Sequence, residues 1–418
     1  MESFTRFFSK NRGFQRQSLW PPFAKGGILF KGDSETMKKI MALLLAGAFL
    51  LSACASPNPA PSSSAAEAPL MSQPPQEDPV SQAEPEPDPE PEPEPDQEWQ
   101  FDTPENHQMD PEQFTRLHQA LSGSTVYAMV TAKDGVLIDE YYQDGYDETS
   151  VFSLHSCSKS FTSALIGIAI EQGHIDSIED LLSKYLPHAA EFTDGKQNLT
   201  LRHLLTQTSG LEWYEWGGGY SNWQEFQTAP NWIDYILSRN MVAQPGAVFN
   251  YSTGNTHLAA AALEQAVGMS ELEYSKINLF EPLGMESVEW RTDPQGITDG
   301  GNGIAMTARD AARFGQLYLQ EGLWNGQQLI PKAWITESTT AQNNGAGDGT
   351  GSYGYFWWMR PFGTKNYPTY YAFGAWGQYI FVVPELSLVT VIACSGPQSS
   401  YAPRPYFTDY VLEAYQGE

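Results

Sequence analysis

Apolar residues after about position 99 occur in runs whose length and bounding residues distinguish strands from helices. Residues 124–132 and 136–142 are short runs, rich in β-branched and aromatic residues, on either side of a Lys-Asp-Gly turn. This pattern predicts a β-hairpin. Residues 379–383 and 388–393 repeat it around a Pro-Glu turn near the end of the chain and predict a second hairpin.

Longer apolar runs between the two hairpins predict helices. Residues 164–170 and 258–267 are too apolar to lie on a surface, and each predicts a buried helix. Shorter helices are expected at residues 175–182, 202–208 and 407–415. Residues 213–226 are rich in aromatic residues and glycine, which favours a loop over a cleft, with surface packing as the alternative.

Strands at both ends of this region, with helices between them, predict an α+β fold. We expect one antiparallel sheet, assembled from the two ends of the region and flanked by helices, and a mainly helical second lobe inserted between the strands. A cleft is expected where the sheet and the helical lobe meet.

The first quarter of the chain has a different pattern and is excluded from the fold argument. Residues 37–54 combine two lysines, a short apolar core and the ending Leu51-Ser-Ala-Cys54, which is typical of a bacterial lipoprotein signal with its lipobox. We expect Cys54 to be lipidated; an ordinary signal with an incidental cysteine is the alternative. Because Met37 is well placed as an initiator, residues 1–36 are interpreted as a misassigned extension.

Residues 55–98 predict a disordered stalk. They hold 13 of the 29 prolines and 11 acidic residues, with neither lysine nor arginine. Alternating proline and like charge cannot bury a core and favours an extended spacer, although a docking motif inside it is possible. The globular domain is therefore placed at residues 99–418, outside the cytoplasm and attached to a bacterial membrane through the lipid alone.

Charge and composition narrow the range of partners. Most of the net charge of −27 falls on residues 99–418, which argues against nucleic acid and against capture by anionic lipid. A neutral or cationic small molecule suits this charge better, although solubility alone could explain it. Cys157 and Cys394 are not expected to form a disulfide, and the seven histidines show no metal-binding spacing. We predict neither a metal nor a cofactor.

The tetrad from Ser156 to Lys159 is the strongest candidate for chemistry. A serine hydroxyl needs a nearby base to become a nucleophile, and residues three apart lie on one face of a helix. Lys159 can therefore direct its amine at Ser156. Burial and a helix N-terminus would both favour the neutral amine. The alternative is a capped helix start with a solvated Lys159.

Tyr251 precedes the second buried helix and is the next candidate. A tyrosine in such a turn can present its hydroxyl to a cleft. Beside a lysine cation its pKa would be lowered, so that it could exchange protons with a serine and a leaving group. Packing alone is the alternative interpretation of this residue.

Together these motifs resemble the serine β-lactamase and penicillin-binding superfamily, and within it the class C-related branch of esterases, D-aminopeptidases and 6-aminohexanoate-oligomer hydrolases. The resemblance rests on Ser156-x-x-Lys159, on Tyr251-Ser-Thr253 about 95 residues later, and on a glycine-rich strand near the end. Further matching phrases lie at residues 203–211, 300–315 and 326–334. It implies a β-lactamase/transpeptidase-like fold and a serine hydrolase acting on small amides or esters.

The resemblance also implies a role for each site residue. Ser156 would be the acylated nucleophile, Lys159 its base partner and Tyr251 the proton shuttle. The backbone N–H groups of Ser156 and Ala375 would form the oxyanion hole, which can contribute several kcal/mol to lowering the barrier. Thr253, Asn302, Gly374 and Trp376 are the expected substrate-binding residues.

The third motif departs from the β-lactamase pattern. Ala372-Phe-Gly374 stands where Lys-Thr-Gly or His-x-Gly is expected, and Thr253 replaces an asparagine. Asn302 could supply the missing amide contact or could only form a turn. Losing a charge-assisted contact to a substrate carboxylate typically costs about 1.5–3 kcal/mol. This argues against efficient β-lactamase activity. A weak β-lactamase or D-amino-acid peptidase, and a non-catalytic cell-wall sensor, are the alternatives.

Overall fold

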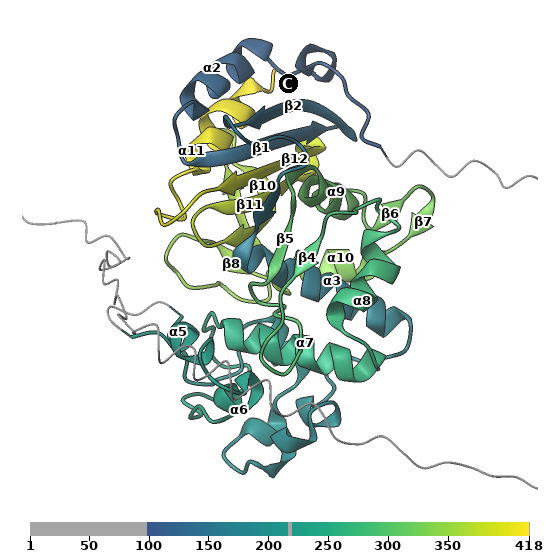
Figure 1. Ribbon diagram of the computed structural model, residues 1–418, viewed down its shortest axis with the longest axis vertical. Coiled ribbons are helices and arrows are strands. Elements are labelled where there is room, and N and C mark those ends of the chain that lie inside the picture. Colours follow the sequence, from purple (N-terminus) through teal and green to yellow (C-terminus); the bar gives the residue numbers. More distant parts are fainter. Residues whose placement is uncertain (1–97, 216–219, 418) are drawn as a thin grey trace, which may run out of the picture. The chain divides into compact units, whose positions relative to one another are not determined.

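The computed structural model describes residues 98–215 and 220–417 (Figure 1). Three predicted segments lie outside the described residues. They are the misassigned extension at 1–36, the lipoprotein signal at 37–54 with Cys54, and all but the last residue of the stalk. Within the described part of the chain, no helix has the length and apolar character needed to cross a membrane.

One antiparallel sheet joins the two ends of the described region. Its order is β2-β1-β12-β11-β10-β9-β8, so the first and last long strands, β1 (Val126–Lys133) and β12 (Leu388–Cys394), are neighbours in its interior. Thr131 of β1 lies opposite Thr390 of β12. The other strands are β2 (Val136–Tyr142), β8 (Ser352–Tyr353), β9 (Trp358–Phe362), β10 (Tyr367–Gly374) and β11 (Gln378–Val383). Both predicted hairpins, β1-β2 and β11-β12, are confirmed.

A smaller sheet of order β3-β5-β4 contains the strand that lies between β2 and the candidate site in the sequence. Its strands are β3 (Val151–Ser153), β4 (Glu289–Trp290) and β5 (Ile304–Thr307). The backbone N–H of Leu154, the residue after β3, donates to Ile304 O at 3.0 Å. The segment before Ser156 is thereby joined to the segment that follows Asn302. A separate short hairpin pairs β6 (Leu323–Trp324) with β7 (Gln327–Gln328).

Helices cover the large sheet and build a second lobe. Helix α9 packs against β1, β11 and β12, whereas α2 and the C-terminal helical segment pack on one another. Helices α5, α6 and α7 lie together on the side away from β1 and β2 (Figure 1). The helices are α2 (Pro111–Leu121), α3 (Ser158–Glu171), α4 (Leu201–Leu205), α5 (Asn222–Phe226), α6 (Trp232–Leu237), α7 (Thr253–Val267), α8 (Glu271–Ser275), α9 (Ala308–Leu319), α10 (Lys332–Ser338) and α11 (Arg404–Tyr406). The predicted α+β fold class is confirmed.

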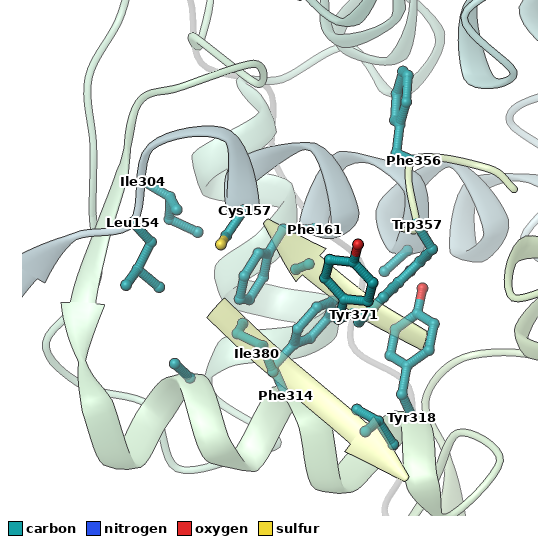
Figure 2. Close-up of a cluster of buried hydrophobic side chains, with 14 of the residues drawn as sticks. Leu154, Cys157, Phe161, Ile304, Phe314, Tyr318, Phe356, Trp357, Tyr371 and Ile380 are labelled. Atoms are coloured by element: carbon teal, nitrogen blue, oxygen red, sulfur yellow. The ribbon is translucent and has the colours of Figure 1, made fainter. Parts of the chain in front are cut away.

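Helix α3 is the centre of the core, as its apolar sequence predicts. Its residues from Ser158 to Ala169 are all buried. The ring of Phe161 stacks on that of Phe314 in α9, with centroids 3.7 Å apart. Figure 2 shows Cys157 and Phe161 at the start of this helix facing the same interior as Phe314 and the β11 residue Ile380. Packing on several sides therefore fixes the position of the turn that carries Ser156.

The prediction of a helix at residues 175–182 is wrong. The segment is irregular, and a short 3-10 turn, Leu182–Lys184, follows it. The carboxylate of Asp180 accepts hydrogen bonds from the backbone N–H groups of Asp176 and Ser177, at 3.2 and 3.4 Å. Such side-chain bonds compete with helical ones. At the C-terminus, helical structure runs from α11 through Phe407–Val411 to Leu412–Ala414, close to the predicted range.

Candidate active site

Ser156 and Lys159 meet at the start of α3. Ser156 lies in a 3-10 turn, His155–Cys157, that leads directly into the helix. Lys159 Nζ lies 3.1 Å from Ser156 Oγ. The side chain of Lys159 is buried, with only 1% of the residue exposed, so the alternative of a solvated lysine is excluded. The contact predicted from the three-residue spacing of Ser156 and Lys159 is therefore present in the structure.

Three acceptors surround the lysine amine. Besides Ser156 Oγ, Nζ donates to the carbonyl oxygen of Gly301 at 2.7 Å and to Thr253 Oγ1 at 3.1 Å. Gly301 belongs to the loop between β4 and β5, and Thr253 begins α7. The three acceptors match the three N–H bonds of an ammonium ion, and a neutral amine can use the third direction to accept a proton.

Burial makes the neutral amine accessible near neutral pH. Desolvation lowers the pKa of Lys159 to about 8, against the opposing effect of the negative charges on Glu215 and Asp299. A lysine with this pKa has an appreciable neutral fraction at pH 7 to 8 and can act as a base.

Tyr251 stands at the turn before α7, where the hydroxyl of Ser252 caps the helix by accepting from Asn255 N at 3.2 Å. Its ring centre lies 5.0 Å from Lys159 Nζ, and its ring stacks on Trp358 with centroids 5.7 Å apart. Burial, reinforced by Tyr353, raises the pKa of Tyr251 well above its ordinary value. The predicted lowering of this pKa is therefore wrong, because desolvation of the buried hydroxyl is the largest effect on it. Tyr251 is a neutral hydroxyl.

Asn302 is drawn into the same cluster. Ser156 Oγ lies 3.4 Å from Asn302 Oδ1, a long contact between two buried side chains, and its one rotatable proton can point either to this oxygen or to Lys159 Nζ at 3.1 Å. The backbone N–H of Asn302 donates to Asp299 O at 3.3 Å, so the residue also takes part in a turn. Its side chain borders the candidate nucleophile, where a substrate amide could meet it.

The third motif ends β10 beside the turn that carries Ser156. A methyl group on Gly374 would lie 2.3 Å from Leu154 O, so the backbone of β10 approaches this turn too closely for any side chain at 374. Ala375 directly follows Gly374 and therefore comes immediately after this close approach. Ala372 is buried, and the ring of Phe373 stacks on Tyr379 and Tyr401. Neither residue offers a cation or hydroxyl.

Sequence reasoning missed two neighbours of the candidate site. Glu215 is a buried carboxylate that contacts Thr253, and the ring of His155 lies against the indole of Trp376. Burial lowers the pKa of His155 to about 4, and the charge of Arg291 acts in the same direction. The sequence signal for Glu215 is its position among the aromatic residues of 213–226. An acidic residue in such an apolar segment is expected to be buried, and a buried carboxylate needs hydrogen-bond donors around it.

Among residues 98–215 and 220–417, no group of histidine, cysteine, aspartate and glutamate side chains is arranged to hold a metal ion. Cys157 and Cys394 are both free thiols.

Comparison with known proteins agrees with the geometry. The sequence model of a family described as Beta-lactamase matches residues 114–412. A 6-aminohexanoate-dimer hydrolase of Paenarthrobacter ureafaciens is 23% identical over 301 residues, which are 67% of this chain and 75% of that protein. Penicillin-binding protein 4* of Bacillus subtilis is 33% identical over 169 residues, 37% of this chain and 36% of that protein. A solved Bacillus anthracis structure assigned as a 6-aminohexanoate-dimer hydrolase superposes with a TM-score of 0.62 at 26% identity, covering 71% of this chain and 80% of that one.

Proposed function

The chain belongs to the β-lactamase family of serine hydrolases, which act on amide or ester bonds, and from this premise we propose that it forms an acyl-enzyme on Ser156 with small amides or esters. The observation that carries the proposal is the 3.1 Å contact between Lys159 Nζ and Ser156 Oγ, with the pKa of this lysine lowered to about 8 by burial.

The proposed reaction begins with proton transfer from Ser156 to Lys159. As neutral Nζ accepts the hydroxyl proton, Oγ attacks the substrate carbonyl carbon, and the carbonyl oxygen becomes an oxyanion held by the N–H groups of Ser156 and Ala375. The scissile bond then breaks. The leaving group takes a proton from the Tyr251 hydroxyl, which regains one from the Lys159 ammonium.

Deacylation reverses these roles. Water gives a proton to the base and attacks the acyl carbon, the ester bond to Ser156 breaks, and Ser156 Oγ recovers its proton. The proton that Lys159 takes from Ser156 departs with the leaving group in the first half, and the proton that the base takes from water goes to Ser156 Oγ in the second, so each half balances. The neutral state of Tyr251 suits this relay, because a neutral hydroxyl can donate to a leaving group without first being protonated.

The third motif supports a substrate without a carboxylate at the position that the motif contacts. Ala372 is buried and Phe373 stacks on other aromatic rings, so neither residue supplies a cation or a hydroxyl, and His155 is neutral near pH 7 because its pKa is lowered to about 4. The relatives named as 6-aminohexanoate-dimer hydrolases support a small amide as the substrate class. The match to a penicillin-binding protein favours a second candidate, weak β-lactamase or D-amino-acid peptidase activity.

A substrate panel tests the proposal. We expect chromogenic esters or short amides, including the 6-aminohexanoate dimer, to be hydrolysed faster than β-lactams and D-amino-acid amides. Ser156→Ala should abolish turnover and the acyl adduct seen by intact-protein mass spectrometry, whereas Ser163→Ala, elsewhere on α3, should keep both. Ligand binding with no adduct on the native protein would favour the non-catalytic sensor and overturn the acyl-enzyme.

We further propose that the protein is anchored outside the cytoplasm through a lipid on Cys54, and that this anchor is its sole membrane contact. The signal pattern at residues 37–54 and the proline-rich stalk that follows support this location. Cys54→Ser should move the protein from the membrane fraction to the soluble fraction after expression in a bacterial host. Retention of the variant in the membrane fraction would contradict a lipid anchor.

A further inference from the structure

Glu215 is a buried carboxylate, and both of its oxygens accept hydrogen bonds from neighbouring N–H and O–H groups. Only 5% of the residue is exposed. Its Oε2 accepts from Thr253 N at 2.8 Å and from Trp213 Nε1 at 2.5 Å. Its Oε1 accepts from the hydroxyl of Thr253. The carboxylate therefore fixes both the backbone and the side chain at the first residue of α7.

These bonds determine how Thr253 can meet Lys159. A hydroxyl has one proton, and that of Thr253 is committed to Glu215, so Thr253 Oγ1 can act only as an acceptor towards Lys159 Nζ. Gly301 O is likewise an acceptor. The two N–H bonds of the neutral amine are thereby occupied. Its lone pair is left to point at the third neighbour, Ser156 Oγ.

We propose that Glu215 is a positioning residue, which fixes the hydroxyl proton of Thr253 and so directs the lone pair of neutral Lys159 at the Ser156 hydroxyl. This inference rests on the proposed function, because it concerns how Lys159 acts as the base. It gives Thr253, which stands where relatives often have an asparagine, a role towards the lysine.

Glu215 could affect Lys159 in two ways, by orienting Thr253 and by its negative charge. The first should raise activity and the second should lower it, so an experiment can separate them. The charged and titratable groups near Lys159 are Glu215, Asp299, Cys157, Tyr251 and His155. Negative charge on Glu215 favours the ammonium form of the lysine. If charge were its whole role, neutralising Glu215 would increase the neutral amine and raise activity at neutral pH.

Glu215→Gln distinguishes these roles. Because two N–H donors face the position of Oε2, the amide oxygen of the glutamine must lie there, and its NH2 group must face Thr253 Oγ1. The hydroxyl proton of Thr253 then turns towards Lys159 Nζ and competes with Ser156 for the lone pair. The substitution preserves shape while it reverses the direction of one hydrogen bond.

The readout is the rate at which a fluorophosphonate probe labels Ser156, measured against pH. We expect Glu215→Gln to label about 10- to 100-fold more slowly on the alkaline plateau, with the half-maximal point moved to lower pH. Glu212→Gln is the matched control, since Glu212 lies in the same segment and bonds to Asn240. It should label at the native rate. Unchanged or faster labelling of Glu215→Gln overturns the proposal.

A second pair of variants decides the matter if Glu215→Gln does not fold. Thr253→Val removes the hydroxyl and Thr253→Ser keeps it, so the serine variant should label several-fold faster than the valine variant; equal rates overturn the proposal. Failure of the proposed function is recognised separately. If the native protein is not labelled at Ser156, the acyl-enzyme itself is wrong; if it is labelled and the variants match it, only the role of Glu215 is wrong.

Discussion

The imidazole of His155 meets the indole of Trp376 edge to face, with ring centroids 4.8 Å apart, and both residues have left-handed backbone conformations, φ 48° and 64°. His155 directly precedes Ser156, and Trp376 directly follows Ala375. The two proposed oxyanion donors are therefore each flanked by a strained residue, and the two strained residues contact one another. Such a backbone costs about 1–3 kcal/mol per residue for side chains other than glycine, so surrounding contacts must maintain it.

Removing the indole should lower activity without lowering stability. Trp376→Gly loses an aromatic contact worth about 0.5–1.5 kcal/mol and the partial burial of the indole, and it relieves strain of about 1–3 kcal/mol. Because these effects oppose one another, we expect a Tm close to that of the native protein. The turn that carries Ala375 would be less constrained, and kcat should fall about tenfold or more because the oxyanion donors are no longer held in place.

Asn366→Gly is the matched control for this prediction. Asn366 also has a positive φ, 57°, but lies in the turn between β9 and β10. This variant should gain slightly in Tm and keep the native kcat. A Trp376→Gly variant with native kcat and native affinity for a boronic acid inhibitor would show that the ring contact does not organise the site.

The pH dependence of acylation should follow Lys159. Burial lowers the pKa of this lysine to about 8, and the reaction needs its neutral form. Activity should therefore be high above pH 8 and fall about tenfold for each pH unit below it. Neither His155 nor Tyr251 should titrate in this pH range. The pKa of His155 is lowered to about 4, and that of Tyr251 is raised well above its ordinary value. The measurement is kcat/KM for a neutral ester against pH, and a plateau that already begins at pH 6 would contradict this role.

A single methyl group at Gly374 should strongly lower the activity of the protein. In Gly374→Ala the new Cβ would lie 2.3 Å from Leu154 O, a backbone atom two residues before Ser156. Overpacking of this kind costs about 1–3 kcal/mol, and relief requires moving Ala375 or the turn of Ser156. We expect kcat to fall about 100-fold, the size of losing one oxyanion donor.

Gly268→Ala separates this effect from loss of stability. Gly268 ends α7 with φ 73°, and a methyl group there would meet no neighbour within 4 Å. The left-handed backbone costs about 1–2 kcal/mol for alanine, so this variant should lose comparable stability and keep its activity. Equal losses of activity in the two variants would show that the β10 contact has no special part in the site.

The sequence predicts the two hairpins at the ends of the described region and the two buried helices, because their apolar runs are long, but it does not predict β8, β9 or the small β3-β5-β4 sheet, whose strands are short. It also predicts the contact between Ser156 and Lys159, since residues three apart on a helix must lie on one face. The error at residues 175–182 arises from Asp180. Its carboxylate accepts hydrogen bonds from backbone N–H groups, and these bonds compete with the formation of the helix that the apolar pattern predicts.

Contacts between distant segments could not be predicted in the same way. Glu215 reaches Thr253 across 38 residues, and Asn302 reaches Ser156 across 146. Nothing in local spacing connects these pairs. The pKa of Tyr251 was predicted in the wrong direction because the sequence analysis considered only the lysine, whereas the main effect is burial, to which distant residues such as Tyr353 and Trp358 contribute.

Tyr251→Phe tests the proton relay. Phenylalanine keeps the stacking on Trp358, so Tm should change little, while the proton donor to the leaving group is lost. An amine cannot leave as an anion, whereas nitrophenolate can. The fall in kcat should therefore be about 10²–10⁴-fold for an amide and distinctly smaller for a nitrophenyl ester.

Tyr274→Phe provides the control for the tyrosine substitution. Tyr274 is buried in α8, and its hydroxyl donates to Gln172 Oε1 at 2.8 Å. Losing that bond should cost about 1 kcal/mol of stability and leave both activities unchanged. The comparison that matters is the ratio of amide to ester turnover in the Tyr251 variant. Equal losses for the two substrates would mean that Tyr251 supports the geometry of Ser156 and Lys159, and that the leaving group takes its proton from another donor.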